Sequence, residues 1–363
     1  MGVEAFQGDR MEGSNLLRSF RPLIAVMIAL TAGLWVISRI NFSQVVERLN
    51  RIPELTLAVG FLCYCLFVGT KACRFRAILG VDRSILALMP IFSIHTFFSN
   101  VLPFRSADLS YLYLLNKRES VSGSVGLASL IIASVIDLVL MLALLAVAGL
   151  YSGMAGLSYA LLFYLPTLTL LTLILSLFVF SQLASDSPRS LRLFGQLQSR
   201  LTHLSSTQCL IGATGERSKI EDQNQILTLW HRLLIKVVSI FIDLWQALTA
   251  PELRQRQGKI WILSALSLAV RFGFQIYLIQ KMESQLSVVS VLFALSFTNL
   301  FNLLPIQSIG NLGTIEAPFT WALTKCGVSL EVALATGLSL HLVILCYASL
   351  IGLFGFLNHN RLK

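Results

Sequence analysis

Two stretches of this chain place polar and charged residues directly after a proline-broken apolar run. The first reads NVLPFRSADL from Asn100, and the second reads NLLPIQSIGNL from Asn302. Short apolar segments interrupted by Pro or Gly at matching places in two halves point to the binding site of a transporter. We interpret the stretches as one element used twice. The alternative is a chance recurrence of residues that are common at helix ends.

The residues in and after these turns suit recognition of an anionic group. Arg105 can bind a phosphate through two hydrogen bonds, or it can serve only as an orientation charge, and Asp108 follows it. Gly310 and Gly313 allow a close backbone approach. Glu316 falls in the first turn of a predicted helix, whose N-terminal N–H groups favour a phosphate. The alternative role of Glu316 is to stabilise that helix end.

Two charged residues fall near the middle of long apolar runs: Asp137 in 124–150 and Arg271 in 259–280. A charge at the bilayer centre costs at least ~2.5–3.5 kcal/mol, so such residues are functional candidates. We expect either a substrate contact or a mutual ion pair that holds the helices in register. A polar stripe at helical spacing surrounds Arg271 and must face protein or water. Its members are Ser264, Ser267, Arg271 and Gln275.

Two histidines also lie in apolar runs, His341 in 333–357 and His95 in 84–102. A hydrogen-bonded packing role is the alternative to a functional one for both. The predicted substrate-binding residues are Asn100, Arg105, Asp108, Asp137, Arg271, Asn302, Gly310, Gly313, Glu316 and His341. The sequence has no catalytic triad spacing, HExxH or Walker loop, and GNLG alone is too weak to indicate a nucleotide site. We therefore expect no enzymatic activity, no cofactor and no metal.

The composition is that of an integral membrane protein. Hydrophobic residues make up 55% of the 363 residues, charged residues make up 13%, and the mean hydropathy is +0.75. Soluble domains are far less apolar. The formal net charge of +10 comes from Lys and Arg that lie mostly between apolar segments, where they orient the chain and contact anionic headgroups. We expect no nucleic-acid partner, and the six cysteines, without a CxxC pair, predict neither disulfides nor zinc.

Apolar runs long enough to cross ~30 Å of hydrocarbon predict the transmembrane helices. These runs are 22–38, 54–70, 124–150, 157–182, 259–280 and 333–357. We predict that 84–102 and 286–304, which precede the two turns, are re-entrant, because 184–258 carries nine Lys and Arg and should be cytoplasmic. A full crossing by 84–102 alone would force that basic segment outside. The resulting topology leaves three basic residues outside: Arg39, Arg48 and Arg51.

These features divide the chain into three parts: an N-terminal membrane half, 1–183, a cytoplasmic linker, 184–258, and a C-terminal membrane half, 259–363. Within the linker, 226–248 predicts an amphipathic helix that lies in the membrane interface or packs between the halves. The predicted fold class is an all-α polytopic membrane protein. It has six or more transmembrane helices and two Pro-broken re-entrant hairpins in an inverted repeat.

At its two turns the sequence resembles the flippase-like family typified by the transmembrane region of lysylphosphatidylglycerol synthases. The family's Pro-x-Arg-x-Gly-Glu turn corresponds to PFRSAD, with Ala107 and Asp108 in place of Gly-Glu. The family's Gly-Gly-x-Gly-x-x-Glu-Ala corresponds to GNLGTIEA, with Asn311 in place of one Gly, and a Gly-Val pair follows in both. Asp137 matches a family aspartate, and His341 falls where an arginine is common.

The resemblance covers most of 60–357 and implies lipid handling or flipping. Residues up to 363 leave no room for the soluble aminoacyl-transfer domain of true synthases, so the resemblance does not imply synthesis.

We predict an inner (plasma) membrane, multi-pass flippase or transporter that moves a polar-headgroup lipid or lipid-linked precursor by alternating access. The alternative is a non-transporting subunit that scaffolds a lipid or glycan biosynthetic enzyme, and an enzyme that acts on lipid-linked substrates ranks third. The expected partners are lipids with anionic headgroups, a biosynthetic enzyme or a second copy of the chain.

Overall fold

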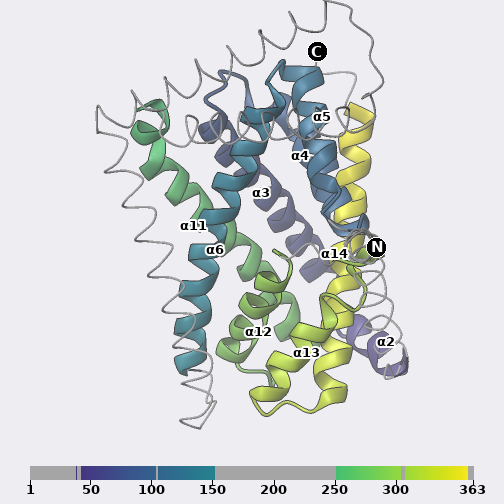
Figure 1. Cartoon of the computed structure of the whole chain (residues 1–363). Coiled ribbons are helices and arrows are strands. Elements are labelled where there is room, and N and C mark those ends of the chain that lie inside the picture. The colour runs from purple at the N-terminus through teal and green to yellow at the C-terminus, as the bar shows by residue number, and fades with distance from the viewer. Residues whose placement is uncertain (1–37, 39–41, 104, 152–250, 304–306, 359–363) are drawn as a thin grey trace, which may run out of the picture.

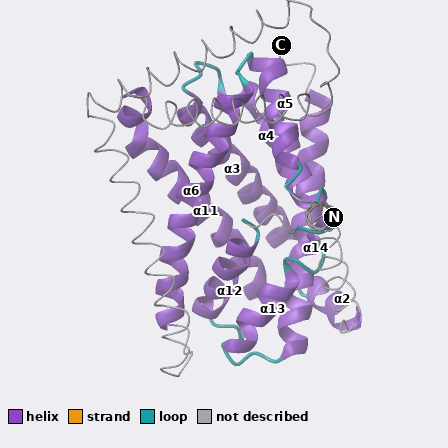
Figure 2. Cartoon of the chain, viewed as in Figure 1, coloured by secondary structure: helices purple, strands orange, loops and turns teal. Residues whose placement is uncertain are grey.

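The computed structural model describes five parts of the chain: residue 38, 42–103, 105–151, 251–303 and 307–358. All regular elements in these parts are helices (Figure 2), so the predicted all-α class is confirmed there. Three predicted segments lie outside the described residues: 157–182, 226–248, and 22–38 apart from its last residue.

Four of the described helices are long and apolar enough to cross a membrane. They are α3 (Glu54–Leu79), α6 (Gly123–Tyr151), α11 (Pro251–Met282) and α14 (Leu330–Asn358). At ~1.5 Å per residue, even the shortest of them exceeds the ~30 Å hydrocarbon core. The runs predicted to span in these parts of the chain are therefore confirmed as long apolar helices: 54–70, 124–150, 259–280 and 333–357.

Each half also contains a pair of short helices joined by a turn. In the first half these are α4 (Ile85–Val101) and α5 (Ala107–Glu119), and in the second α12 (Val288–Phe301) and α13 (Glu316–Lys325). With 17 and 14 residues, α4 and α12 are about 26 and 21 Å long, too short to cross the hydrocarbon core. Figure 1 shows α4 and α5 in the upper half of the molecule and α12 and α13 in the lower half.

The loops that join long helices to short ones gather at two opposite ends of the molecule (Figure 1). The loops 80–84 and 120–122 lie at the upper end, where Arg83 Nε is 3.1 Å from Glu119 Oε2. The loops 283–287 and 326–329 lie at the lower end. The loops next to the first short pair are thus separated from the loops next to the second. That the short helix pairs are re-entrant, and which end faces the cytoplasm, stay predictions.

A short helix that the hydropathy pattern did not reveal, α2 (Phe42–Asn50), lies at the lower end beside α14. It holds Arg48, whose Nη2 lies 3.5 Å from Glu283 Oε2. Arg51, just after the helix, lies 2.6 Å from Glu47 of the helix itself. Two of the basic residues that oppose the predicted topology therefore have carboxylate partners, which gives them a structural reason to lie at this end.

Close helix packing positions the first short pair. Phe75 of α3, Phe92 of α4 and Tyr111 of α5 form an aromatic cluster with ring centroids 5.0 to 5.6 Å apart. On the opposite side α4 packs along α14, where Gly352 and Gly355 face it at close range. These contacts fix the direction in which α4 enters the molecule, and thereby the position of the turn that follows it.

The α4–α14 contact predicts the effect of adding a single methyl group. A Cβ at Gly355 would lie 2.9 Å from Ile94 Cγ1 and 3.0 Å from the carbonyl oxygen of Pro90, whereas a Cβ at Gly273, also in a spanning helix, would meet nothing within 4 Å. We expect Gly355→Ala to destabilise the protein by about 1–3 kcal/mol through overpacking. Gly273→Ala should be neutral or stabilising, because Ala favours helices.

Melting temperatures of the two detergent-purified variants test this expectation. A Gly355→Ala protein that melts at or above the temperature of Gly273→Ala would show that α4 and α14 do not pack this closely.

Candidate functional site

The two proline-containing turns meet in a cavity of about 210 Å³ at the centre of the described helices. The first turn and the helix ends beside it contribute Asn100, Arg105 and Asp108, and the second contributes Asn302, Gln307 and Asn311. The long helices add further charged and polar side chains, namely Lys71, Arg74, Asp137, Arg271 and Gln275. Six of the predicted site residues thus line one cavity: Asn100, Arg105, Asp108, Asp137, Arg271 and Asn302.

The two turns are joined directly by hydrogen bonds. Arg105 Nη1 donates to the carbonyl oxygen of Leu303 at 3.2 Å, and Asn311 Nδ2 donates to that of Ser99 at 3.0 Å. Arg105 and Asn311 both have a φ of 55°, which is uncommon for residues other than glycine. Such backbone strain clusters at functional sites. The two side chains that bridge the turns are therefore held in position at a conformational cost.

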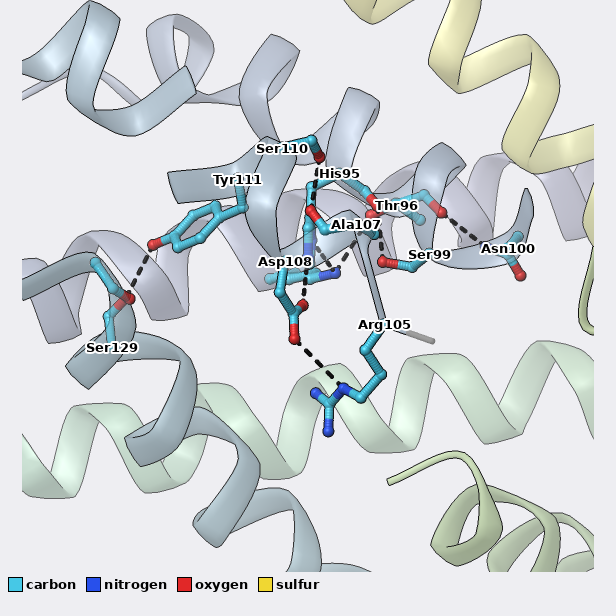
Figure 3. A network of polar contacts seen from close by, with 12 residues as sticks. His95, Thr96, Ser99, Asn100, Arg105, Ala107, Asp108, Ser110, Tyr111 and Ser129 are labelled. Atoms are coloured by element: carbon cyan, nitrogen blue, oxygen red, sulfur yellow. Dashed lines mark hydrogen bonds and ion pairs between the residues drawn. The ribbon is translucent and has the colours of Figure 1, made fainter. Parts of the chain in front are cut away.

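A chain of polar contacts runs along the wall formed by the first turn (Figure 3). Lys71 Nζ lies 3.1 Å from His95 Nδ1, His95 Nε2 lies 3.2 Å from Asp108 Oδ1, and Asp108 Oδ2 lies 3.3 Å from Arg105 Nε. A lysine ammonium can only donate, so Nδ1 accepts and the proton of His95 is on Nε2, which donates to Asp108. His95 is therefore a neutral link between Lys71 and Asp108.

Asp137 of α6 forms an ion pair with Arg74 of α3. The predicted pair of Asp137 with Arg271 is thus wrong: in the described residues the carboxylate is taken by Arg74. The reason is that α3 continues to Leu79, beyond the apolar run 54–70. Arg74, which follows the apolar run in the sequence, lies inside this helix and is 5% exposed.

Arg271 lies in the cavity wall without a carboxylate within 4.0 Å in the parts of the chain that the structure describes. Its guanidinium carbon is 5.7 Å from the centroid of the Phe67 ring, at cation–π distance. The predicted polar stripe around it does face protein, since Ser264, Ser267 and Gln275 are at most 5% exposed. Arg271 thus presents its charge to the cavity.

Four predicted site residues are not part of the cavity lining: Gly310, Gly313, Glu316 and, on α14, His341. Glu316 Oε2 accepts a hydrogen bond from Gly313 N at 2.7 Å, and Oε1 lies 2.5 Å from His341 Nδ1. Both side chains are fully buried, and Gly310 and Gly313 have φ angles of 62° and 81°. Glu316 and His341 therefore tie the turn to the start of α13 and to α14. This arrangement favours the stabilising role that was the alternative for Glu316.

Two cavity residues on α3 were missed from the sequence, Lys71 and Arg74. A signal for them exists, because Tyr64, Phe67, Lys71 and Arg74 recur at spacings of three and four and so share one helix face. The predicted span 54–70 ended before both residues, because the apolar run ends there. No group of three or more metal-ligating side chains occurs in the described residues.

The Arg74–Asp137 pair predicts a pattern of recovery in double variants. Arg74→Gln and Asp137→Asn should each reduce the amount of folded protein, because removing one partner of a buried pair leaves the other charge uncompensated. The loss should fall below the ~3–5 kcal/mol of fully buried pairs, since the Asp137 side chain is 33% exposed.

Fluorescence-detected size exclusion of the membrane extract measures the folded amount. The double variant Arg74→Gln with Asp137→Asn should recover it, and Arg271→Gln with Asp137→Asn should not. Recovery by the Arg271 combination instead would contradict the pairing.

Similarity to known proteins agrees with this architecture. A family model described as the lysylphosphatidylglycerol synthase TM region matches residues 23–352. The matched region includes both turns and every residue that lines the cavity. No curated protein and no solved structure matches the chain. Because the match covers most of its length, the chain belongs to the family of the lysylphosphatidylglycerol synthase transmembrane region.

Proposed function

We propose that this membrane protein moves a lipid with a polar headgroup between the two leaflets, as a flippase or transporter. One observation carries the proposal: the charged central cavity adjoins an apolar groove of about 430 Å³ along α6. The two share Arg105, Asp108, Leu130, Ser134 and Leu303. A polar cavity continuous with an aliphatic groove fits an amphiphile, whose headgroup and acyl chains need opposite environments.

The apolar groove is built from one face of α6. Aliphatic side chains at spacings of three and four line it, from Leu127 through Ile131 and Val135 to Leu138. It meets the cavity beside Arg105 and Asp108, so a lipid whose chains occupy the groove would bring its headgroup to these two charges. A water-soluble substrate would have no use for such a groove.

The helix contacts support alternating access by two inverted repeats. In the described residues, α3, α4, α5 and α6 of the first half follow the order long, short, short, long, and α11, α12, α13 and α14 of the second half repeat it. Exchanging the halves turns the contact of α4 with α14 into one of α12 with α6, and both occur. The contact of α3 with α11 maps onto itself. This pattern is what two-fold related halves would produce.

Re-entrant turns that meet at the bilayer midplane complete the proposed mechanism. The short pairs lie in opposite halves of the molecule (Figure 1), and residues of both turns line the cavity, as broken helices do in transporters built from inverted repeats. The hydrogen bonds of Arg105 to Leu303 and of Asn311 to Ser99 join the halves at this point. Rocking one half against the other would break these bonds and open the cavity to each side in turn. We place this cycle in the plasma membrane of a bacterial-type cell.

The central role of Arg105 gives a test of transport. Arg105→Gln removes a charged donor to Leu303 and the ion pair with Asp108, and losing one charge-assisted hydrogen bond costs ~1.5–3 kcal/mol. We expect transbilayer lipid movement to fall at least about tenfold, with folded protein retained. Lys117→Gln is the matched control, because Lys117 is an exposed cation of α5 whose contacts within the described residues are with the Tyr113 hydroxyl and ring.

Proteoliposomes with fluorescent lipids, read by chemical quenching of the outer leaflet, measure this movement. If wild-type vesicles move lipids of every headgroup no faster than protein-free vesicles, the transport proposal fails and the scaffolding role replaces it.

A further inference from the structure

The cavity has more positive than negative side chains. Among the described residues that line it, the basic ones are Lys71, Arg74, Arg105 and Arg271, and the carboxylates are Asp108 and Asp137. Each carboxylate contacts an arginine, Asp137 with Arg74 and Asp108 with Arg105. The neutral His95 adds no charge. The excess comes from Arg271, because the other two arginines are paired with carboxylates and a guanidinium stays protonated in proteins.

Arg271 is placed to bind an oxyanion. The ring of Phe67 is at cation–π distance from its guanidinium, whose five N–H donors lie in the plane and at the edges of the group. A planar guanidinium matches the oxygens of a phosphate through paired hydrogen bonds. A charge at membrane depth requires a partner, and the described residues supply no carboxylate within 4.0 Å. The phosphate of a lipid headgroup would be that partner.

The cavity also offers buried oxygen atoms that need a hydrogen-bond donor. Asn311 donates through Nδ2 to Ser99, which fixes the orientation of its amide, and its Oδ1 has no partner in the described structure. Gln275 lies one helical turn beyond Arg271, and its Oε1 also lacks a partner there. Both residues are 4% exposed and line the cavity. Buried acceptors of this kind are normally satisfied, so they indicate a ligand with donor groups.

Hydroxyl groups are the donors that fit. An ammonium group could also donate to Asn311 and Gln275, but it would be repelled by the positive excess beside it. A hydroxyl donates without carrying charge. The volume of about 210 Å³ is below the ~300–1,000 Å³ of pockets for drug-sized ligands, so it suits a headgroup alone. The acyl chains would then lie in the adjoining groove along α6.

We infer that the lipid of the proposed transport function is an anionic phosphodiester with a hydroxylated headgroup, such as a phosphoglycerol lipid. Its phosphate binds Arg271 with the help of Lys71, and its hydroxyls donate to Asn311 and Gln275. Zwitterionic lipids and lipids that carry an aminoacyl group are disfavoured, because their ammonium groups meet the positive excess. This inference rests on the proposed function, whose substrate it specifies.

Lipid binding to the purified full-length protein tests the inference without measuring transport. Native mass spectrometry in detergent gives relative affinities for four probes: phosphatidylglycerol, phosphatidylmethanol, phosphatidylcholine and lysylphosphatidylglycerol. Phosphatidylmethanol is an anionic phosphodiester without headgroup hydroxyls, so it separates the charge from the hydroxyls. We expect phosphatidylglycerol to bind at least about tenfold more tightly than phosphatidylcholine and lysylphosphatidylglycerol, and about threefold or more above phosphatidylmethanol.

Variants assign each preference to its residue. Arg271→Gln should abolish the preference for anionic lipids, and Arg271→Lys, which keeps the charge, should retain part of it. Gln275→Met should remove only the advantage of phosphatidylglycerol over phosphatidylmethanol. Lys117→Gln, the exposed control, should change neither preference. If Arg271→Gln fails to fold, the Lys and Met variants still decide the two parts of the inference.

Several outcomes would overturn the inference. Equal affinities for phosphatidylglycerol and phosphatidylcholine would refute selection by charge, and equal affinities for phosphatidylglycerol and phosphatidylmethanol would refute selection by hydroxyls. An equal effect of Lys117→Gln and Arg271→Gln would attribute the preference to surface charge. Displacement of the lipid by an equal concentration of inorganic phosphate would assign the site to free phosphate.

The inference and the proposed function fail separately. Selective binding of phosphatidylglycerol without transbilayer movement would remove transport and keep the site. Movement of all lipids without preference would remove only the inference.

Discussion

Charged side chains within apolar helices must contact protein or water rather than lipid, and the centre of this molecule is arranged around that constraint. Lys71 and Arg74 come from α3, Asp137 from α6 and Arg271 from α11, yet all four line a single cavity. Dispersing them over the outer faces of the helices would cost several kcal/mol for each charge. Placing them together lets carboxylates and arginines pair and leaves one aqueous or ligand-filled space to solvate the rest.

The same constraint acts on the backbone where the helices are broken. A turn enclosed by packed helices has N–H and C=O groups that bulk water does not reach, so protein groups must satisfy them. The carbonyl oxygen of Ser99 accepts a hydrogen bond from Asn311, and that of Leu303 accepts one from Arg105, in each case from the opposite half. Each turn thus satisfies part of the other, and neither half would be complete alone. The cavity between them follows from this mutual dependence.

Hydropathy predicted the long helices and the two short segments because it records which residues tolerate lipid, and that is a local property of the sequence. The repeated Asn-x-Leu-Pro pattern likewise located both turns. The partner of Asp137 could not be found this way, since Arg74 and Arg271 are both basic residues near apolar runs. Only the packing of α3 against α6 brings Arg74 to that carboxylate. Helix α2 was missed because its nine residues are too short and polar to register as a span.

The two turns are similar in sequence but hold their acidic residues in different ways. Asp108, at the start of α5, is 30% exposed and belongs to a polar chain that faces the cavity. Glu316, at the start of α13, is fully buried and bonded to Gly313 and His341. The backbone of the second turn has glycines at positive φ and needs an internal carboxylate to hold it. The carboxylate that stabilises one turn is therefore unavailable to a ligand, whereas its counterpart in the other turn remains in reach of one.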